Sequence, residues 1–171
     1  MSNQLCRYST VLADPPWNIQ QSGHWGAENH YNLLPVSAIA ALPVGRVAAP
    51  DAHCWLWVTN TSLWAGKQVL EAWGFTYRSI LTWIKPKFGL GSYLRNQTEH
   101  LLLGTRGKAP ILFRGQGSWL YAPGQEHSHK PEEQYAVIER CSPGPYLELF
   151  ARRPRAGWHV WGNQIDSDVE L

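Results

Sequence analysis

Residues 11–17 read Val11-Leu12-Ala13-Asp14-Pro15-Pro16-Trp17, an apolar run that meets an acid, two prolines and an indole. The run that begins at Tyr8 and ends at Ala13 has the β-branched and aromatic character of a buried strand. Proline has no N–H to donate, so Pro15 and Pro16 must end the hydrogen-bonded ladder of that strand. Open α/β sheets bind ligands at the carboxyl ends of their strands, and we therefore place the active site at this turn.

The turn after this strand offers groups that suit a flat amine. The Asp14 carboxylate only accepts hydrogen bonds, the two proline carbonyls are held rigidly, and Trp17 adds an apolar face. An exocyclic amine of a nucleobase fits, with one N–H on Asp14, the other on the Pro15 carbonyl and the ring stacked on an aromatic side chain. Such stacking contributes about 1–3 kcal/mol per base. The alternative is an ordinary turn, with Pro16 shaping the backbone and Trp17 buried in the core.

Composition limits the class of protein. With 171 residues, of which 44% are hydrophobic, the chain can bury one good core, and we expect a single domain over residues 1–171. The net charge of +2 is far below that of a tail-driven nucleic-acid binder. The three cysteines are widely spaced, which argues against a disulfide framework or a zinc site and suits a reducing cytoplasm. No leader peptide or membrane-spanning run is visible, so we expect no membrane association.

The remaining patterns divide the chain into regular elements and loops. Strands are predicted at residues 8–13, 54–59, 75–85, 98–105, 146–151 and 158–161. Helices are predicted at residues 35–42, from Ser62 to Gly74, and from Pro131 through Cys141. Residues 18–31 and 106–127 are polar, contain glycine and lack periodicity, so we interpret them as loops near the active site.

The stretch between the third and fourth predicted strands combines cationic and aromatic side chains. Lys87, Tyr93 and Arg95 lie in it, and cations neutralise phosphates while aromatic rings stack on bases. We therefore expect these three residues to contact nucleic acid, as part of a discontinuous basic rim. The rim would comprise Lys85, Lys87, Arg95, Arg106, Lys108 and Arg114. A solvated surface is the competing interpretation.

Lys130 lies just before a predicted helix, where exposed backbone N–H groups favour an anion. Its ammonium would therefore suit a carboxylate or a phosphate, and a plain surface lysine is the alternative. No Gly-x-Gly run follows Phe150, so the sequence shows no glycine-rich cofactor fingerprint there.

Five motifs together resemble those of one family. They are Asp14-Pro15-Pro16-Trp17, residues 91–104, Ser128-His129-Lys130-Pro131, residues 148–152 and Gly162-Asn163-Gln164. In this order and approximate spacing they resemble the MT-A70 family of S-adenosylmethionine-dependent adenine N6-methyltransferases. The resemblance extends from about Val11 to Gln164.

The resemblance implies a fold and a set of roles. The fold would be α/β, a Rossmann-like class I methyltransferase with a mixed, mostly parallel sheet, helices on both faces and a circularly permuted motif order. Catalysis would belong to Asp14, Pro15, Pro16 and Trp17, and Tyr31 would help to wall the adenine pocket. S-adenosyl-L-methionine would be bound by Asp14, Lys130, Phe150, Arg152, Asn163 and Gln164, with Lys130 on the methionine carboxylate.

We therefore expect methyl transfer to the N6 amine of adenine in nucleic acid, with DNA favoured over RNA and no metal required. In a duplex the adenine would have to be flipped out; a single-stranded substrate is the other option. A catalytically silent nucleic-acid-binding or scaffold subunit is the main alternative, and an amine methyltransferase acting on protein is another. A homo- or heterodimeric partner stays open.

Overall fold

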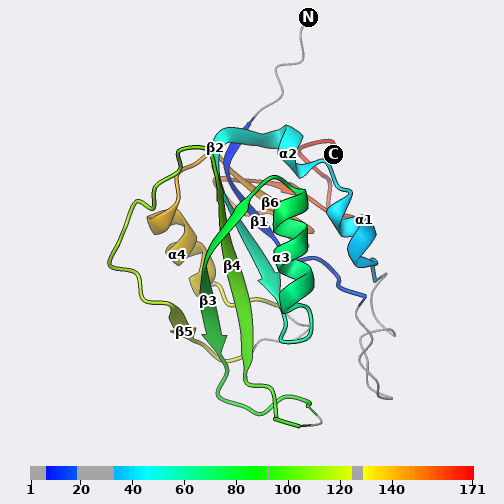
Figure 1. Cartoon of the computed structure of the whole chain (residues 1–171), viewed down its shortest axis with the longest axis vertical. Helices are drawn as coiled ribbons and strands as arrows, with labels where there is room; N and C mark the ends of the chain where they lie inside the picture. Colours follow the sequence, from blue (N-terminus) through cyan, green and yellow to red (C-terminus); the bar gives the residue numbers. More distant parts are fainter. Residues whose placement is uncertain (1–6, 19–32, 92, 125–128) are drawn as a thin grey trace, which may run out of the picture.

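The computed structural model describes residues 7–18, 33–91, 93–124 and 129–171, and these build strands and helices around one sheet (Figure 1). The strands are β1 (Tyr8–Ala13), β2 (Ala48–Val58), β3 (Thr76–Ile84), β4 (Thr98–Arg106), β5 (Trp119–Tyr121), β6 (Tyr146–Leu149) and β7 (Trp158–Trp161). The helices are α1 (Val36–Ala40), α2 (Val44–Val47), α3 (Leu63–Ala72) and α4 (Glu133–Cys141).

The sheet is mixed and mostly parallel, as predicted. In the described part of the chain its seven strands lie in the order β5-β3-β4-β2-β1-β6-β7. Strand β4 is antiparallel to both of its neighbours, whereas all other adjacent pairs are parallel. The amino end of β4 therefore lies at the same edge of the sheet as the carboxyl ends of the other strands. The circularly permuted motif order stays a prediction.

Helices cover both faces of the sheet, which confirms the predicted layers (Figure 1). On one face, Ile39 of α1 and Leu70 of α3 pack against side chains of β1 and β2 such as Val11. On the other face, Ile138 of α4 packs with Leu12 and with a group of tryptophans. Neighbouring residues of β1 thus enter different cores, because side chains alternate across a strand. Asp14 directly follows this interior strand.

Most predicted elements match the structure, including the end of α3. Gly74 follows this helix with φ of +86°, a left-handed conformation that glycine adopts without a steric penalty, so it stops the helix as predicted. Helix α4 begins later than predicted, at Glu133. Its first turn is tighter than an α-helix, since Gln134 N–H bonds to the carbonyl of Pro131, three residues back.

Three elements differ from the sequence prediction. Strand β2 begins at Ala48 rather than near Cys54, because its pairing with β1 shifts register and the irregular part accommodates Pro50 and Asp51. The short helix α2 follows α1, where we expected only a helix end. Strand β5 lies within residues 106–127, which the sequence predicts to be a loop. It is the outermost strand of the sheet and pairs only with β3 among the described strands.

Among the helices in the described ranges, none has the length and apolar character that a membrane span requires.

Packing of α3 on the sheet predicts an effect of one substitution. A Cβ added at Gly66 would meet a Val58 side-chain carbon at 2.3 Å, so Gly66→Ala must displace α3 from β2. Overpacking of this kind typically costs about 1–3 kcal/mol, which exceeds the gain of about 0.5–1 kcal/mol from replacing glycine in a helix. We expect urea denaturation to show a lower free energy of unfolding for Gly66→Ala. Gly117→Ala is the control, because nothing lies within 4 Å of a Cβ there; equal stability of both variants would contradict the packing argument.

Candidate active site

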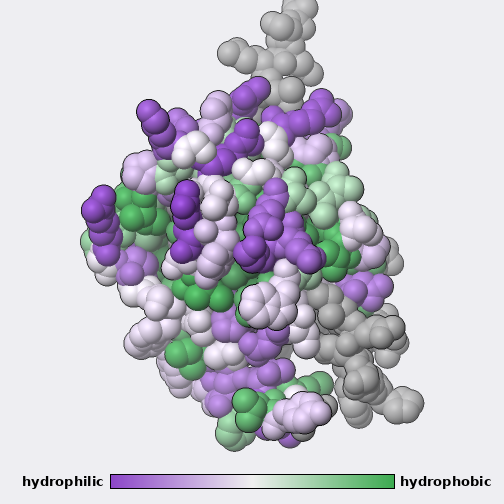
Figure 2. Space-filling view, viewed as in Figure 1, coloured by the Kyte–Doolittle hydropathy of each residue, from purple (hydrophilic) through white to green (hydrophobic). Residues whose placement is uncertain are grey.

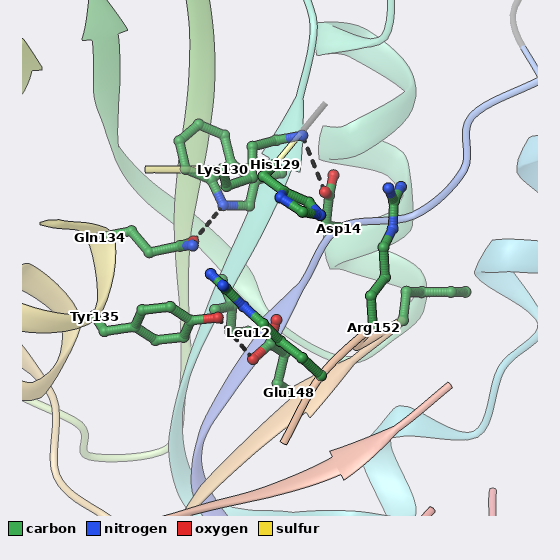
Figure 3. Close-up of a pocket in the computed structure, with 11 residues that line it drawn as sticks. Leu12, Asp14, His129, Lys130, Gln134, Tyr135, Glu148 and Arg152 are labelled. Atoms are coloured by element: carbon green, nitrogen blue, oxygen red, sulfur yellow. Dashed lines mark hydrogen bonds and ion pairs between the residues drawn. The ribbon is translucent and has the colours of Figure 1, made fainter. Parts of the chain in front are cut away.

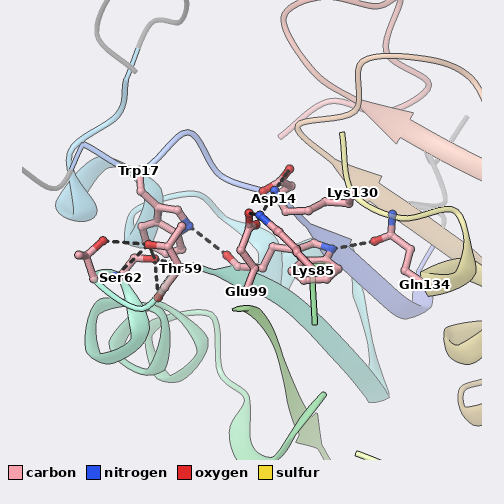
Figure 4. Close-up of polar contacts among 10 residues, drawn as sticks. Asp14, Trp17, Thr59, Ser62, Lys85, Glu99, Lys130 and Gln134 are labelled. Carbon is pink, nitrogen blue, oxygen red and sulfur yellow. Dashed lines mark hydrogen bonds and ion pairs between the residues drawn. The ribbon is translucent and has the colours of Figure 1, made fainter. Parts of the chain in front are cut away.

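An ammonium group between two carboxylates marks the predicted active-site edge. Lys130 Nζ lies 2.9 Å from Asp14 Oδ2 and 3.3 Å from Glu99 Oε2 (Figures 3 and 4). Asp14 follows β1, Glu99 is near the amino end of β4, and Lys130 precedes α4. Because β4 runs against the other strands, all three reach the same edge of the sheet. Lys85, at the end of β3, also pairs with Glu99.

The charges of this group stabilise one another. Burial raises the pKa of Glu99, but the ammonium groups of Lys130 and Lys85 outweigh burial and hold this pKa below its ordinary value. Burial lowers the pKa of Lys130, but the carboxylates of Asp14 and Glu99 outweigh it and raise that pKa. Glu99 and Lys130 are therefore both charged at neutral pH.

The turn that carries Asp14 is fixed by hydrogen bonds from the backbone and from one indole. Trp17 N–H donates to the Pro15 carbonyl at 2.9 Å, and Leu34 N–H donates to the Pro16 carbonyl at 2.8 Å. Trp17 Nε1 donates to the carbonyl of Trp57, in β2, at 3.0 Å (Figure 4). A carbonyl oxygen has two lone pairs, so Pro15 retains capacity to accept a second hydrogen bond.

A cavity of about 190 Å³ opens beside Asp14, between α4 and the sheet (Figure 3). Its lining combines cations, carboxylates and aromatic rings. The lining residues are Leu12, Asp14, Trp57, His129, Lys130, Gln134, Tyr135, Glu148, Phe150, Arg152 and Arg153. Trp57 contributes to its shape through Nε1, which donates to Gln134 at 2.7 Å, and its ring lies 5.5 Å from Lys130 Nζ.

Glu148 places a second carboxyl group in the cavity, on β6. Tyr135 of α4 donates its hydroxyl to Glu148 Oε2 at 2.9 Å. Burial, together with the negative charge of Asp14, raises the pKa of Glu148 to about 7, while the Tyr135 hydrogen bond and the charge of Arg155 act in the opposite direction. The group is thus partly protonated at neutral pH.

The cavity wall next to β6 depends on unusual backbone geometry. Phe150 has φ of 62°, a conformation rare for residues with a side chain and often found at functional sites. Its ring packs edge-on against Trp161 of β7. At the neighbouring turn a Cβ on Gly162 would lie 2.4 Å from the Ala151 carbonyl, which explains the glycine of the Gly162-Asn163-Gln164 motif.

The structure brings together only part of the predicted donor site. Asp14, Lys130, Phe150 and Arg152 line one cavity. Asn163 and Gln164 follow β7 at the same edge of the sheet, but both are exposed and neither belongs to the cavity lining. Their role stays a prediction.

The predicted substrate residues also lie outside the cavity. Lys87, Tyr93 and Arg95 are exposed on the loop between β3 and β4. Trp17 is partly buried beside the Asp14 turn. Tyr31 lies outside the described residues.

Sequence reasoning gave no role to several residues that the structure places at the site. Glu148 lies within an apolar strand, and a charged residue in such a strand is a sign of a polar cavity. Gln134 and Tyr135 could be assigned to a helix, but not to its cavity-facing side. Glu99 lies in a predicted strand, and its partners are Lys85 and Lys130, the second of which is far away along the chain.

The donor set of the cavity fits S-adenosylmethionine. This molecule carries a carboxylate and two cationic groups, and the cavity lining contains side chains of complementary charge: Lys130 and Arg152 would suit the carboxylate, and the carboxyl groups of Asp14 and Glu148 would suit the cationic groups. Phe150 adds an apolar surface. Within the described residues, no group of three or more His, Cys, Asp or Glu side chains is arranged to hold a metal ion.

Comparisons with known proteins agree with this chemistry. The MT-A70 family model matches residues 8–164. The chain is 33% identical to an N(6)-adenosine-methyltransferase MT-A70-like protein of Drosophila melanogaster, over 95% of the chain and 28% of that protein. It is 32% identical to the N(6)-adenosine-methyltransferase catalytic subunit METTL3 of Homo sapiens, over 95% of the chain and 29% of that subunit. It is 29% identical to the type II methyltransferase M.MunI of Mycoplasma sp, over 96% of the chain and 81% of that enzyme. The chain thus spans less than a third of the first two relatives.

The raised pKa of Glu148 predicts a pH-dependent contribution to stability. The folded chain keeps the Glu148 proton up to about pH 7, whereas the ordinary value is 4.5, so this contribution is complete below pH 4.5 and is lost as pH rises through 7. As pH rises from 5 to 8, the free energy of unfolding should fall less for Glu148→Gln, which cannot ionise, than for the unmodified chain. The two decreases should differ by at most about 3 kcal/mol. Urea denaturation at several pH values measures this difference. Glu71→Gln, at an exposed site on α3, is the control; parallel profiles for Glu148→Gln and the unmodified chain would contradict the prediction.

Proposed function

Because the chain belongs to the MT-A70 family, we propose that it transfers a methyl group from S-adenosylmethionine to the N6 amine of adenine in nucleic acid. One observation carries the proposal: the carboxylate of Asp14, directly after β1, lines the cavity whose side chains suit the methyl donor. Asp14 contributes to both the cavity and the rigid turn with Trp17. A single carboxylate can therefore contact the donor and the acceptor amine.

The acceptor side of the site is preorganised. Asp14 would accept one N–H of the adenine amine and the Pro15 carbonyl the other, with Trp17 beside the ring. The amine is a weak nucleophile because its lone pair is delocalised into the ring. Two fixed acceptors favour the pyramidal geometry it needs and stabilise the positive charge that develops on nitrogen.

The donor side would be held by the cations and the aromatic ring of the cavity. When bound, S-adenosylmethionine supplies an activated methyl group on a sulfonium. Lys130 has three N–H donors; within the described residues it donates one to Asp14 at 2.9 Å and forms an ion pair with Glu99, and the methionine carboxylate would accept another. Phe150 and Arg152 would contact the rest of the molecule, and Asn163 and Gln164 would reach its ribose and adenine from the end of β7.

The polymer and the assembly are finer parts of the proposal. We propose DNA before RNA, because the chain covers 81% of one relative that is a type II methyltransferase, but less than a third of the two relatives cited above that are named for adenosine methylation. A silent scaffold subunit is the competing function. Incubation of the purified chain with labelled methyl donor and matched DNA and RNA oligonucleotides separates these cases, because a scaffold transfers no label to either polymer.

Asp14→Ala removes the carboxylate that would contact both the methyl donor and the adenine amine. We expect transfer to fall at least about 100-fold, as when a preorganised transition-state contact is lost, while donor binding stays measurable by calorimetry. Asp51→Asn is the control, because Asp51 is exposed near the start of β2, at the opposite edge of the sheet. If Asp14→Ala loses transfer, donor binding and the folded state together, Asp14 is structural and the catalytic assignment is wrong.

Lys130→Ala removes the cation assigned to the donor carboxylate. Charge-assisted hydrogen bonds contribute about 1.5–3 kcal/mol, so we expect the donor Kd to rise about 10- to 100-fold. Lys130→Arg, which retains the charge, should recover part of this affinity. Lys67→Ala on the exposed face of α3 is the matched control. An unchanged donor Kd in a folded Lys130→Ala protein would rule out the assignment.

A further inference from the structure

The loop between β3 and β4 presents large apolar side chains to solvent. Phe88, Leu90, Tyr93 and Leu94, which we call the apolar tip, have exposed fractions of 70%, 63%, 101% and 82%. The loop extends away from the sheet at the bottom of Figure 1, and Figure 2 shows hydrophobic atoms at its end. Apolar groups gathered in this way usually mark an interaction site.

Hydrogen bonds hold the described residues of this loop in one shape. Gly89 N–H donates to the Asn96 carbonyl at 2.7 Å, and Asn96 N–H donates to the Leu90 carbonyl at 3.3 Å. A Cβ on Gly91 would lie 1.9 Å from the Leu94 carbonyl, so the two sides of the loop approach as closely as glycine allows. Asn60, after β2, donates to Asn96 Oδ1 at 3.1 Å and ties the loop to the sheet. These contacts therefore fix the position of the apolar tip relative to the sheet.

The loop begins at the active-site edge of the sheet, and all of its charged residues are cations. Its first residue, Lys85, pairs with Glu99, which in turn contacts Lys130 beside Asp14 (Figure 4). Residues 85–98 contain three cations and no acid. Lys87 and Arg95 are exposed on either side of the tip. These positive charges favour binding of a polyanion over binding of an apolar protein surface that carries no acidic residues.

Resting on the proposed function, we propose that the apolar tip is a wedge that enters a nucleic-acid duplex next to the target adenine, while Lys87 and Arg95 contact phosphates. A base must leave the stack before its amine can reach Asp14, and unstacking is unfavourable. Apolar side chains inserted between base steps compensate for this loss. The wedge thus gives this chain a way to act on paired adenine, which the cavity alone does not provide.

The test compares substrates that do and do not require opening. The double variant Leu90→Ala/Leu94→Ala and the control Leu112→Ala, an equally apolar exposed site after β4, are assayed on one oligonucleotide in three forms: single-stranded, fully paired, and with a mismatch opposite the target adenine. We expect the double variant to lose about tenfold or more of the rate on the paired form. Its rates on the other two forms should fall much less, and Leu112→Ala should match the unmodified chain.

A second measurement works without methyl transfer. With 2-aminopurine at the target position of the duplex, the unmodified chain should raise the fluorescence by unstacking this base, and the double variant should not. This result supports the wedge even if no methyl group is transferred, in which case only the proposed function fails. No rise with the unmodified chain, equal losses on all three substrates, or action on single strands alone would overturn the wedge. A loss of self-association in the double variant by sedimentation velocity, with unstacking unchanged, would make the tip a subunit contact instead.

Discussion

The ion pairs of Lys130 with Asp14 and Glu99 are the constraint on which the active-site edge depends. The three side chains are mostly shielded from water, with 13%, 29% and 18% of their surface exposed. Two carboxylates this close repel each other, and a partly buried ammonium is unfavourable unless it is paired. Each charge is stabilised by the others, and these ion pairs connect the carboxyl end of β1, the amino end of β4 and the segment before α4. Asp14 and Lys130 line the cavity, together with residues of β2, α4 and β6 and the turn after β6.

The direction of β4 decides what can meet there. Among the described strands only β4 is antiparallel to both of its neighbours, and it therefore brings Glu99 and the β3–β4 loop to the edge where β1, β6 and β7 end. Trp57 of β2 then joins the two halves of the site. Its carbonyl accepts the Trp17 indole on the acceptor side, and its own indole donates to Gln134 on the donor side. Because the carbonyl and the indole N–H of this buried tryptophan are both hydrogen-bonded, it connects the two halves rigidly.

Sequence reasoning located elements best where an apolar run ends at a glycine or a proline. Helix α3 ends before Gly74, and β1 ends before Pro15, because the backbone of these residues leaves few alternatives. It failed for β5, a three-residue strand that exists only because β3 offers it an edge to pair with. It also failed for the first half of β2, where Pro50 and Asp51 disfavour a strand and long-range pairing with β1 overrides that preference.

The sequence by itself determined the strand that carries the chemistry, the acid-proline-proline-indole turn and the cation before α4, since these follow from side-chain type and local backbone limits. Tertiary structure alone decided which groups share the cavity and how they are charged. Glu99 is held ionised by two ammonium groups, whereas Glu148 is partly protonated beside Tyr135, although both are glutamates in strands. The reason is that the pKa of a carboxyl group depends on burial and on neighbours that lie far away along the chain.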